Sequence, residues 1–212
     1  MKPRVGAYVA YGQISLAVFL ALCVALHPGF VLKANEGGMS NYGIHAKTAA
    51  AYTLALGLPA LFSFLAARLI TTSQGPQRRL RLLLGTYVGL VILTLLSTYV
   101  YSFNTVLKDL HIVFGSALTV FESAASIWMF VALGRRSTDG VLLAVQILGF
   151  VVEVLTFAGL WHVLFFSEVL TSGAYAILLV RTARTSETVD VGASMRFGPG
   201  NGRVHRRVER EA

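Results

Sequence analysis

Long runs of apolar residues, separated by short polar stretches, dominate the hydrophobic pattern of the chain. They lie near residues 8–31, 48–70, 82–103, 110–133, 141–160 and 162–180. A helix needs about 20 apolar residues to cross the hydrocarbon core of a bilayer, and each run reaches roughly that length. The pattern therefore predicts an all-α fold, a polytopic membrane bundle of six transmembrane helices within residues 1–182.

The fifth and sixth runs follow each other almost without a break. Residues 141–180 carry Glu153 and Glu168 as their charged side chains, and the stretch is too long for a single crossing. We place a turn in the Gly-Leu-Trp-His sequence at 159–162, because glycine allows a tight turn and tryptophan favours the headgroup level.

Composition changes the picture in two ways. The chain of 212 residues is 55% hydrophobic and 13% charged, which excludes an ordinary soluble domain. Residues 183–212 differ from the rest, because they are rich in arginine and carry too little apolar surface to fold alone. We expect them to form a basic, disordered tail that touches anionic lipid, with docking of a cytoplasmic partner as the alternative.

Basic residues are distributed unequally between the two sides of the predicted bundle. Of the 18 Lys and Arg residues, 15 fall on the side that holds both termini, and the other side holds Lys33, Lys47 and Lys108. Because cytoplasmic loops carry the excess of Lys and Arg, we expect a multi-pass protein of the cell membrane with both termini cytoplasmic. Topology and tail account for the net charge of +8, so we expect no nucleic-acid partner.

Three glutamates, Glu122, Glu153 and Glu168, interrupt the predicted spans. Ionisable side chains inside a membrane are costly and point to function. Glu122 follows His111 by about three helical turns, which predicts that both lie on one face. Glu153 and Glu168 flank the predicted turn, so we expect them at similar depth, sharing a proton or a cation. The alternative is that each glutamate is protonated and bonded to a facing hydroxyl or carbonyl group.

Histidines form the second polar pattern, at the outer ends of the predicted spans. These are His27, His45, His111 and His162. The same predicted layer holds Glu36, Asn41 and Asp109. Imidazole with carboxylate suits zinc, so a zinc site is the alternative to ordinary interfacial polar residues. Because the histidines lie on one side, they allow at most one haem, and we expect no resident cofactor.

Two further segments have a distinctive composition. Between the first two spans, glycines flank Ser40 and Asn41, a composition that favours tight turns with exposed backbone donors. This outer loop either holds a polar headgroup or is a plain connector. In the third span, Gly85-x-x-x-Gly89 allows close packing of helices.

The outer loop also carries a family resemblance. Its sequence Met39-Ser40-Asn41-Tyr42-Gly43, together with the six spans, resembles the DRAM/FRAG/Sfk-type membrane proteins and their bacterial relatives. Members of that group have an Ile-Ser-Asp-x-Gly-like element after the first span. This chain matches it at Ser40 and Gly43 and has Asn41 in place of the acid. The resemblance implies a non-catalytic protein linked to lipid distribution or membrane organisation.

We therefore expect a non-enzymatic membrane protein that binds lipid, a membrane-protein partner or a second copy of itself through its outer face and an inter-helix cavity. The predicted ligand-binding residues are Glu36, Ser40, Asn41, His45, Asp109, Glu122, Glu153 and Glu168. Lipid binding predicts a cleft between helices that opens sideways to the bilayer below the outer loop.

Two alternatives make different structural predictions. An intramembrane metal-dependent lipid hydrolase would hold its metal with His27, His45, His111 and His162, and would bring at least three ligands of this layer within about 5 Å of one point. A proton- or cation-coupled transporter would place Glu153 opposite Glu168 across a wet cavity.

Overall fold

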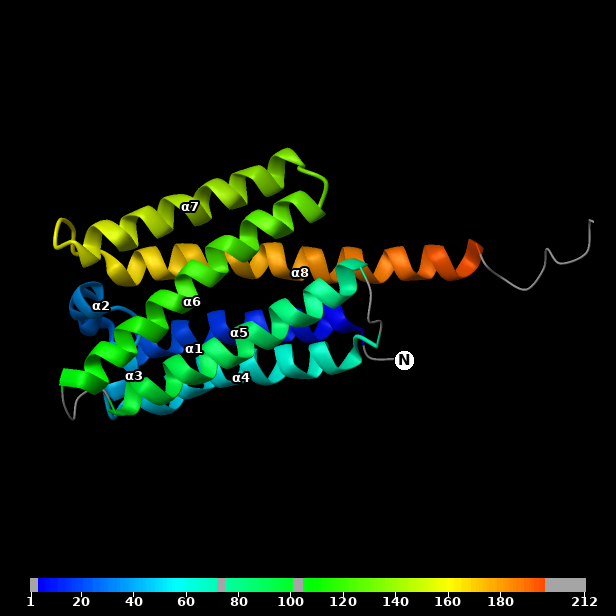
Figure 1. Ribbon diagram of the computed structural model, residues 1–212. Coiled ribbons are helices and arrows are strands. Elements are labelled where there is room, and N and C mark those ends of the chain that lie inside the picture. Colours follow the sequence, from blue (N-terminus) through cyan, green and yellow to red (C-terminus); the bar gives the residue numbers. More distant parts are fainter. Residues whose placement is uncertain (1–3, 72–74, 101–104, 197–212) are drawn as a thin grey trace, which may run out of the picture.

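The computed structural model describes residues 4–71, 75–100 and 105–196, except for the side chains of Glu36 and of 188–196. Within these ranges the chain is entirely helical, without a strand. The elements are α1 (Val5–Leu26), a 3₁₀ turn (Pro28–Phe30), α2 (Val31–Gly37), α3 (Asn41–Ile44), α4 (Ala49–Leu69), α5 (Gly75–Val100), α6 (Thr105–Ala132), α7 (Ser137–Phe157) and α8 (Leu164–Arg196) (Figure 1).

Six of these helices are long and apolar enough to cross a membrane: α1, α4, α5, α6, α7 and the part of α8 up to Glu187. Large apolar side chains also remain exposed on the outside of the bundle, among them Ile14, Leu96 and Val141, as expected where lipid replaces water as the solvent. This architecture confirms the predicted all-α fold and is that of a multi-pass membrane protein.

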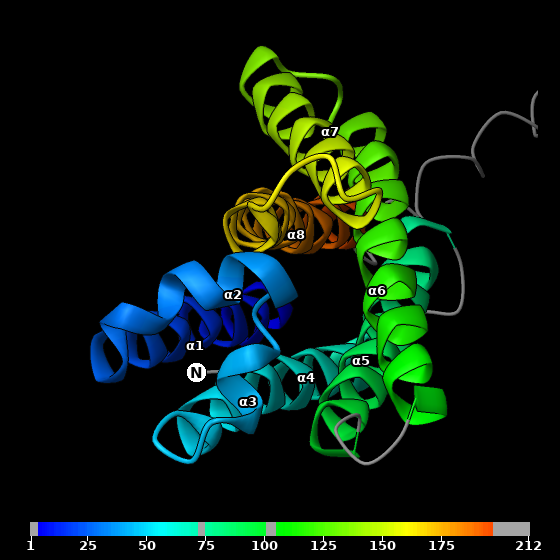
Figure 2. The same cartoon turned by 90° about the vertical axis from the view of Figure 1, so that its left-hand side faces the viewer.

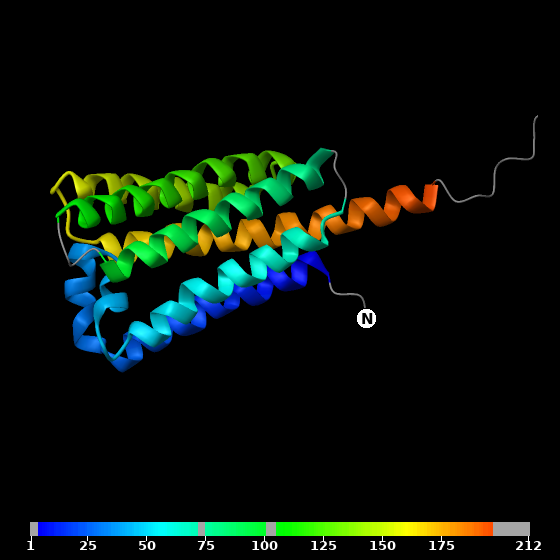
Figure 3. The ribbon, with the colours of Figure 1, turned by 60° about the horizontal axis from the view of Figure 1, so that its bottom comes forward.

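The two ends of the bundle differ in structure. The short helices α2 and α3, with the residues between them, are here named the cap. The cap lies at one end of the bundle, the cap end, beside the end of α1 and the start of α4 (Figures 1 and 2). The other end, here named the basic end, holds the start of α1 and the C-terminal part of α8. There α8 extends beyond the other helices (Figure 3).

The first membrane helix is shorter at its C-terminus than predicted. The hydrophobic run continues to residue 31, but α1 ends at Leu26. Pro28 is the cause, because a proline disfavours helical geometry in the residue before it. His27 accordingly has φ −145° and ψ 64°. The apolar residues that follow form the 3₁₀ turn and the start of α2 and do not extend α1.

The predicted outer loop is more ordered than its glycine content indicates, because α2 and α3 occupy most of it. The bend between them lies at Gly38, with φ +80°, a conformation that glycine adopts at little cost. Tyr42 of α3 is buried and packs its ring against Phe30 and Phe165. Burial raises the pKa of the Tyr42 hydroxyl.

The turn between the last two membrane helices confirms the prediction made from 159–162. Helix α7 ends at Phe157 and α8 begins at Leu164, and Gly159 has φ +75°. The sixth helix itself differs from the prediction, because α8 does not end near 180 but continues to Arg196. The predicted tail thus begins as helix, and its part from 197 to 212 lies outside the described residues.

Close helix contacts occur at glycines other than the predicted pair. A Cβ atom at Gly12 of α1 would lie 3.2 Å from Pro59 of α4, and one at Gly149 of α7 would lie 2.6 Å from Thr171 of α8. At Gly85 and Gly89 a Cβ atom would meet nothing within 4 Å. Gly85 and Gly89 therefore take part in no close helix contact among the described residues.

Candidate functional site

A lateral groove runs along the outside of the bundle between the antiparallel helices α1 and α8. Its volume is about 570 Å³, and apart from Met39 its walls come from these two helices alone. It is lined by Ala10, Gln13, Ile14, Leu16, Ala17, Leu20, Met39, Val169, Ser172, Gly173, Ala176, Ile177, Val180, Arg181 and Arg184. Because no third membrane helix contributes to it, the groove opens sideways.

The groove changes in character along its length. Near the cap end its walls are apolar, with Leu20 and Val169, and at the basic end it reaches Arg181 and Arg184. From Val169 to Arg184 the helical rise gives a length of about 22 Å. Gln13 is buried in the middle of the groove wall, and its amide oxygen has no hydrogen-bond partner among the described residues.

The two arginines of the groove have different surroundings. Arg181 forms an ion pair of 2.6 Å with Asp139 of α7, whose side chain is fully buried. Arg184 lies one turn later and is exposed, with its side-chain stem against Gly6 of α1. Arg184 is thus the cation of the groove that is more accessible to a ligand.

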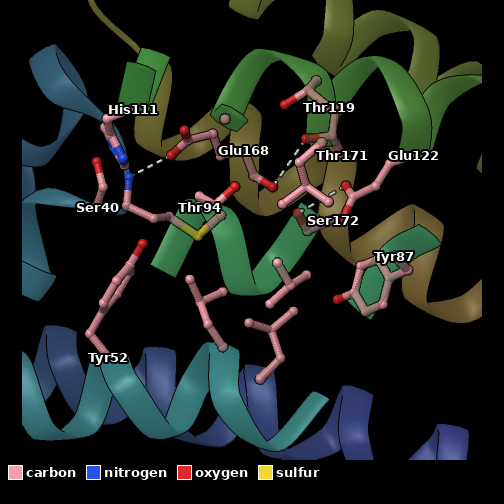
Figure 4. A pocket seen from close by; sticks show the side chains of 16 residues that line it. Ser40, Tyr52, Tyr87, Thr94, His111, Thr119, Glu122, Glu168, Thr171 and Ser172 are labelled. Carbon is pink, nitrogen blue, oxygen red and sulfur yellow. Dashed lines mark hydrogen bonds between the residues drawn. The ribbon is translucent and has the colours of Figure 1, made fainter. Parts of the chain in front are cut away.

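A second, smaller space lies inside the bundle below the cap. This cavity of about 80 Å³ receives side chains from the cap and from α1, α4, α5, α6 and α8 (Figure 4). Its polar lining consists of Ser40, Tyr52, Tyr87, Thr94, His111, Thr119, Glu122, Glu168, Thr171 and Ser172. Cavity and groove share Leu16, Met39 and Ser172 as wall residues. The two spaces are therefore neighbours.

Helical spacing explains which side chains reach the cavity. On α6 the lining includes His111, Gly115 and Glu122. Gly115 follows His111 by about one helical turn and Glu122 follows Gly115 by about two turns, so the three residues lie on one face of the helix. This confirms the prediction that His111 and Glu122 share a face. On α8 the spacing from Glu168 to Ser172 is one turn, so both point the same way.

Two of the three glutamates, Glu122 and Glu153, accept hydrogen bonds from hydroxyl groups on a facing helix. Ser172 donates to Glu122 Oε2 at 3.3 Å, and Thr171 donates to Glu153 Oε1 at 2.7 Å. Hydroxyl groups on α8 therefore hold the carboxyl groups of α6 and α7.

Glu168 is bonded differently, because its donor comes from the cap. The backbone N–H of Met39 donates to Glu168 Oε2 at 2.5 Å. The predicted arrangement of Glu153 facing Glu168 across a cavity is not what the structure has, because Glu153 is absent from the cavity lining and bonds to Thr171. The carboxyl groups that share the cavity are Glu122 and Glu168.

The predicted layer of histidines is divided between three environments. His27 and His45 are T-stacked with ring centroids 4.5 Å apart, and Phe30 packs against both. His111 Nδ1 lies 2.9 Å from the hydroxyl of Ser97 inside the bundle. His162 is exposed in the turn between α7 and α8.

No group of three or more His, Cys, Asp or Glu side chains in the described ranges lies close enough together to hold a metal ion. The three-ligand set required by the zinc hypothesis is therefore not formed there. Among the remaining predicted residues, Asp109 is exposed at the start of α6. Asn41 donates to the Lys33 carbonyl at 3.3 Å. Glu36 lies on α2, with its side chain outside the described part.

Burial lowers the pKa of His27, and the neighbouring His45 lowers it further, as do Lys47 and Lys33 at longer range. His27 therefore favours the neutral imidazole at the cap end.

Sequence reasoning missed most hydroxyl residues of the site. Thr171 and Ser172 were accessible to it, because they follow Glu168 at three and four residues and so lie on its face. Thr94 and Tyr87 on α5 gave no comparable signal, since their helix carries no charge nearby. The groove between α1 and α8, and the position of Gln13 in its wall, could not be predicted, because they depend on which helices become neighbours.

Comparison of the chain with protein-family models, with curated proteins and with solved structures gave no match. The resemblance of its outer loop to the DRAM/FRAG/Sfk-type proteins therefore stays a prediction.

Proposed function

We propose that this protein binds a membrane lipid in the groove between α1 and α8. The acyl chain would lie against the apolar walls, and an anionic headgroup would lie at Arg184. The observation that carries the proposal is the groove itself, which is apolar, open to the side and basic at one end. Its volume of about 570 Å³ is within the usual range of ligand pockets, about 300–1,000 Å³.

The orientation of the protein follows from the same charges. If the basic end faces the cytoplasm of a cell membrane, as the excess of Lys and Arg predicts, the groove opens at Arg184 into the inner leaflet. Anionic lipids give that leaflet its negative surface potential. The chain would thus take its lipid from the cytoplasmic side and contribute to membrane organisation without catalysis.

Lipid retained through purification tests the proposal. The full chain is purified in mild detergent from membranes containing phosphatidylglycerol and phosphatidylcholine, and bound lipid is measured by native mass spectrometry. Gly173→Leu fills the groove without a clash, because a Cβ atom there meets nothing within 4 Å. Gly89→Leu is the matched control on α5, where the same space is open outside the groove.

We expect Gly173→Leu to lose the bound lipid and Gly89→Leu to keep it. Arg184→Gln should weaken retention of phosphatidylglycerol by about fivefold, the effect of one cation at the membrane surface, whereas Arg81→Gln, an exposed arginine on α5, should not. Equal retention in the two leucine variants would overturn the proposal. If Gly173→Leu instead dissociates a dimer, the groove is a protein contact and the proposal is wrong.

A further inference from the structure

The basic end of the groove holds two arginines that differ in how their charge is paired. Arg181 and Arg184 are the charged residues among those that line the groove. They lie three residues apart on α8 and are therefore neighbours on the helix surface. Both would contact one headgroup if both guanidinium groups faced the groove. The number of negative charges that the groove can bind thus depends on where each guanidinium lies.

The guanidinium of Arg181 is held by α7. Its Nη1 atom lies 2.6 Å from Oδ1 of Asp139 and donates to the hydroxyl of Thr138 at 3.3 Å. Both partners belong to the first turn of α7. Helix α8 lies between α7 and α1 (Figures 1 and 2), whereas the groove lies between α8 and α1. The charge of Arg181 is therefore directed toward α7 and not across the groove toward α1.

The burial of Asp139 keeps Arg181 in this position. The side chain of Asp139 has no exposed surface, and a buried carboxylate needs a cation or it becomes very costly. Among the described residues, Arg181 is the cation that forms an ion pair with it. Moving Arg181 to a ligand would leave the buried carboxylate unpaired, which costs more than one partly exposed ion pair gains.

Arg184 lies on the side of α8 that faces the groove. Its side-chain stem packs against Gly6 of α1, and the residue is exposed. It forms no ion pair with the residues whose side chains the structure describes. The backbone N–H of Gly6, a further donor at this end, is bonded to Glu187 Oε1 at 3.0 Å. A headgroup in the groove therefore meets one unpaired positive charge.

We propose that the groove selects lipids whose headgroup carries a single negative charge, and that Asp139 sets this selectivity by holding Arg181 out of the binding site. The selectivity rests on lipid binding in the groove, as proposed above. Asp139 is a positioning residue, because it acts through Arg181 and does not contact the lipid. The phosphodiester of phosphatidylglycerol matches one cation. The phosphomonoester of phosphatidic acid carries up to two negative charges, since its second pKa is about 6, and the second charge finds no cation.

Competition between these two lipids tests the proposal. The full chain is purified in mild detergent and mixed with equimolar phosphatidylglycerol and phosphatidic acid of the same acyl chains at about pH 8, where the monoester is doubly charged. Native mass spectrometry then gives the ratio of bound lipids. We expect the wild type to retain at least as much phosphatidylglycerol as phosphatidic acid. Asp139→Asn should shift the ratio toward phosphatidic acid about fivefold, the effect of one further cation at the membrane surface. Asp109→Asn, at an exposed position, is the matched control and should leave the ratio unchanged.

Two further variants keep the test decisive if Asp139→Asn fails to fold. Val180→Arg adds a second cation to the groove wall without touching Asp139, and it should also shift the ratio toward phosphatidic acid. The double variant Asp139→Asn with Arg181→Gln leaves no buried charge unpaired, and it should keep the wild-type ratio and the wild-type retention of phosphatidylglycerol.

The outcomes separate this selectivity from lipid binding itself. A wild type that prefers phosphatidic acid, an unchanged ratio in folded Asp139→Asn or in Val180→Arg, or a loss of phosphatidylglycerol in the double variant would overturn the proposal. If the wild type retains neither lipid, lipid binding in the groove is wrong as well. If it retains both and no variant moves the ratio, lipid binding stands and the selectivity alone is wrong.

Discussion

The backbone N–H of Met39 donates a hydrogen bond to the carboxylate of Glu168 and so fastens the cap to the membrane helices. Met39 lies between α2 and α3, and Glu168 lies one turn inside α8. The contact joins residues that are 129 positions apart. It also places the cap directly over the polar cavity.

Gly38 makes this contact possible, and its replacement should loosen the cap. With φ +80° and ψ −178°, Gly38 adopts a conformation that other residues avoid, and a Cβ atom would lie 2.7 Å from Glu168 Oε1. We expect Gly38→Ala to lower the free energy of unfolding by about 2 kcal/mol and to speed proteolysis within the cap. Gly29→Ala, where a Cβ atom meets nothing within 4 Å, should change neither. Equal effects of the two variants would contradict this role.

The ion pair between Asp139 and Arg181 should stabilise the packing of α7 on α8. Asp139 is fully buried and Arg181 is about one third exposed, so losing the pair should cost about 2 kcal/mol, less than a fully buried pair. Asp139→Asn should therefore lower the Tm, whereas Asp109→Asn, at an exposed position, should leave it within error. An unchanged Tm for Asp139→Asn would show that the pair contributes no net stability.

Gly149 should matter more for stability than Gly85, although both lie inside membrane helices. A Cβ atom at Gly149 would approach the Thr171 methyl group to 2.6 Å and the Ser167 carbonyl to 3.3 Å. We expect Gly149→Ala to destabilise the fold by about 1–2 kcal/mol through overpacking. Gly85→Ala, in open space, should be neutral or stabilising by up to about 1 kcal/mol. Denaturant unfolding of both variants measures the difference, and a reversed order would contradict the packing of α7 on α8.

Acid should weaken the cap through His27. Its pKa is lowered in the folded chain, by burial first and then by His45, Lys47 and Lys33, so the unfolded chain binds the proton more readily. The stability that His27 contributes is then present above its ordinary pKa of 6.5 and is lost as the pH falls below it. The protection factors of the α2 amides, which correct for the intrinsic slowing of hydrogen exchange at low pH, should fall between pH 7 and pH 5. In His27→Gln the fall should be smaller, and an equal fall would exclude His27 as the cause.

The hydrophobic pattern alone predicted the number and approximate positions of the membrane helices. A membrane span requires about 20 apolar residues in a row, and this requirement is local in sequence. For the same reason the turn after α7 was predictable from its glycine. The shared face of His111 and Glu122 was predictable as well, because the period of a helix is fixed.

The tertiary structure decided which helices became neighbours, and with them the site. Glu168 shares a cavity with Glu122 and not with Glu153. On α8, Glu168 points toward the cap, and the side chain that contacts Glu153 is Thr171. The groove arises because no third membrane helix covers the gap between α1 and α8. Such relationships depend on the rotation of each helix about its axis and on side-chain fit between segments far apart in sequence, which a periodic pattern does not encode.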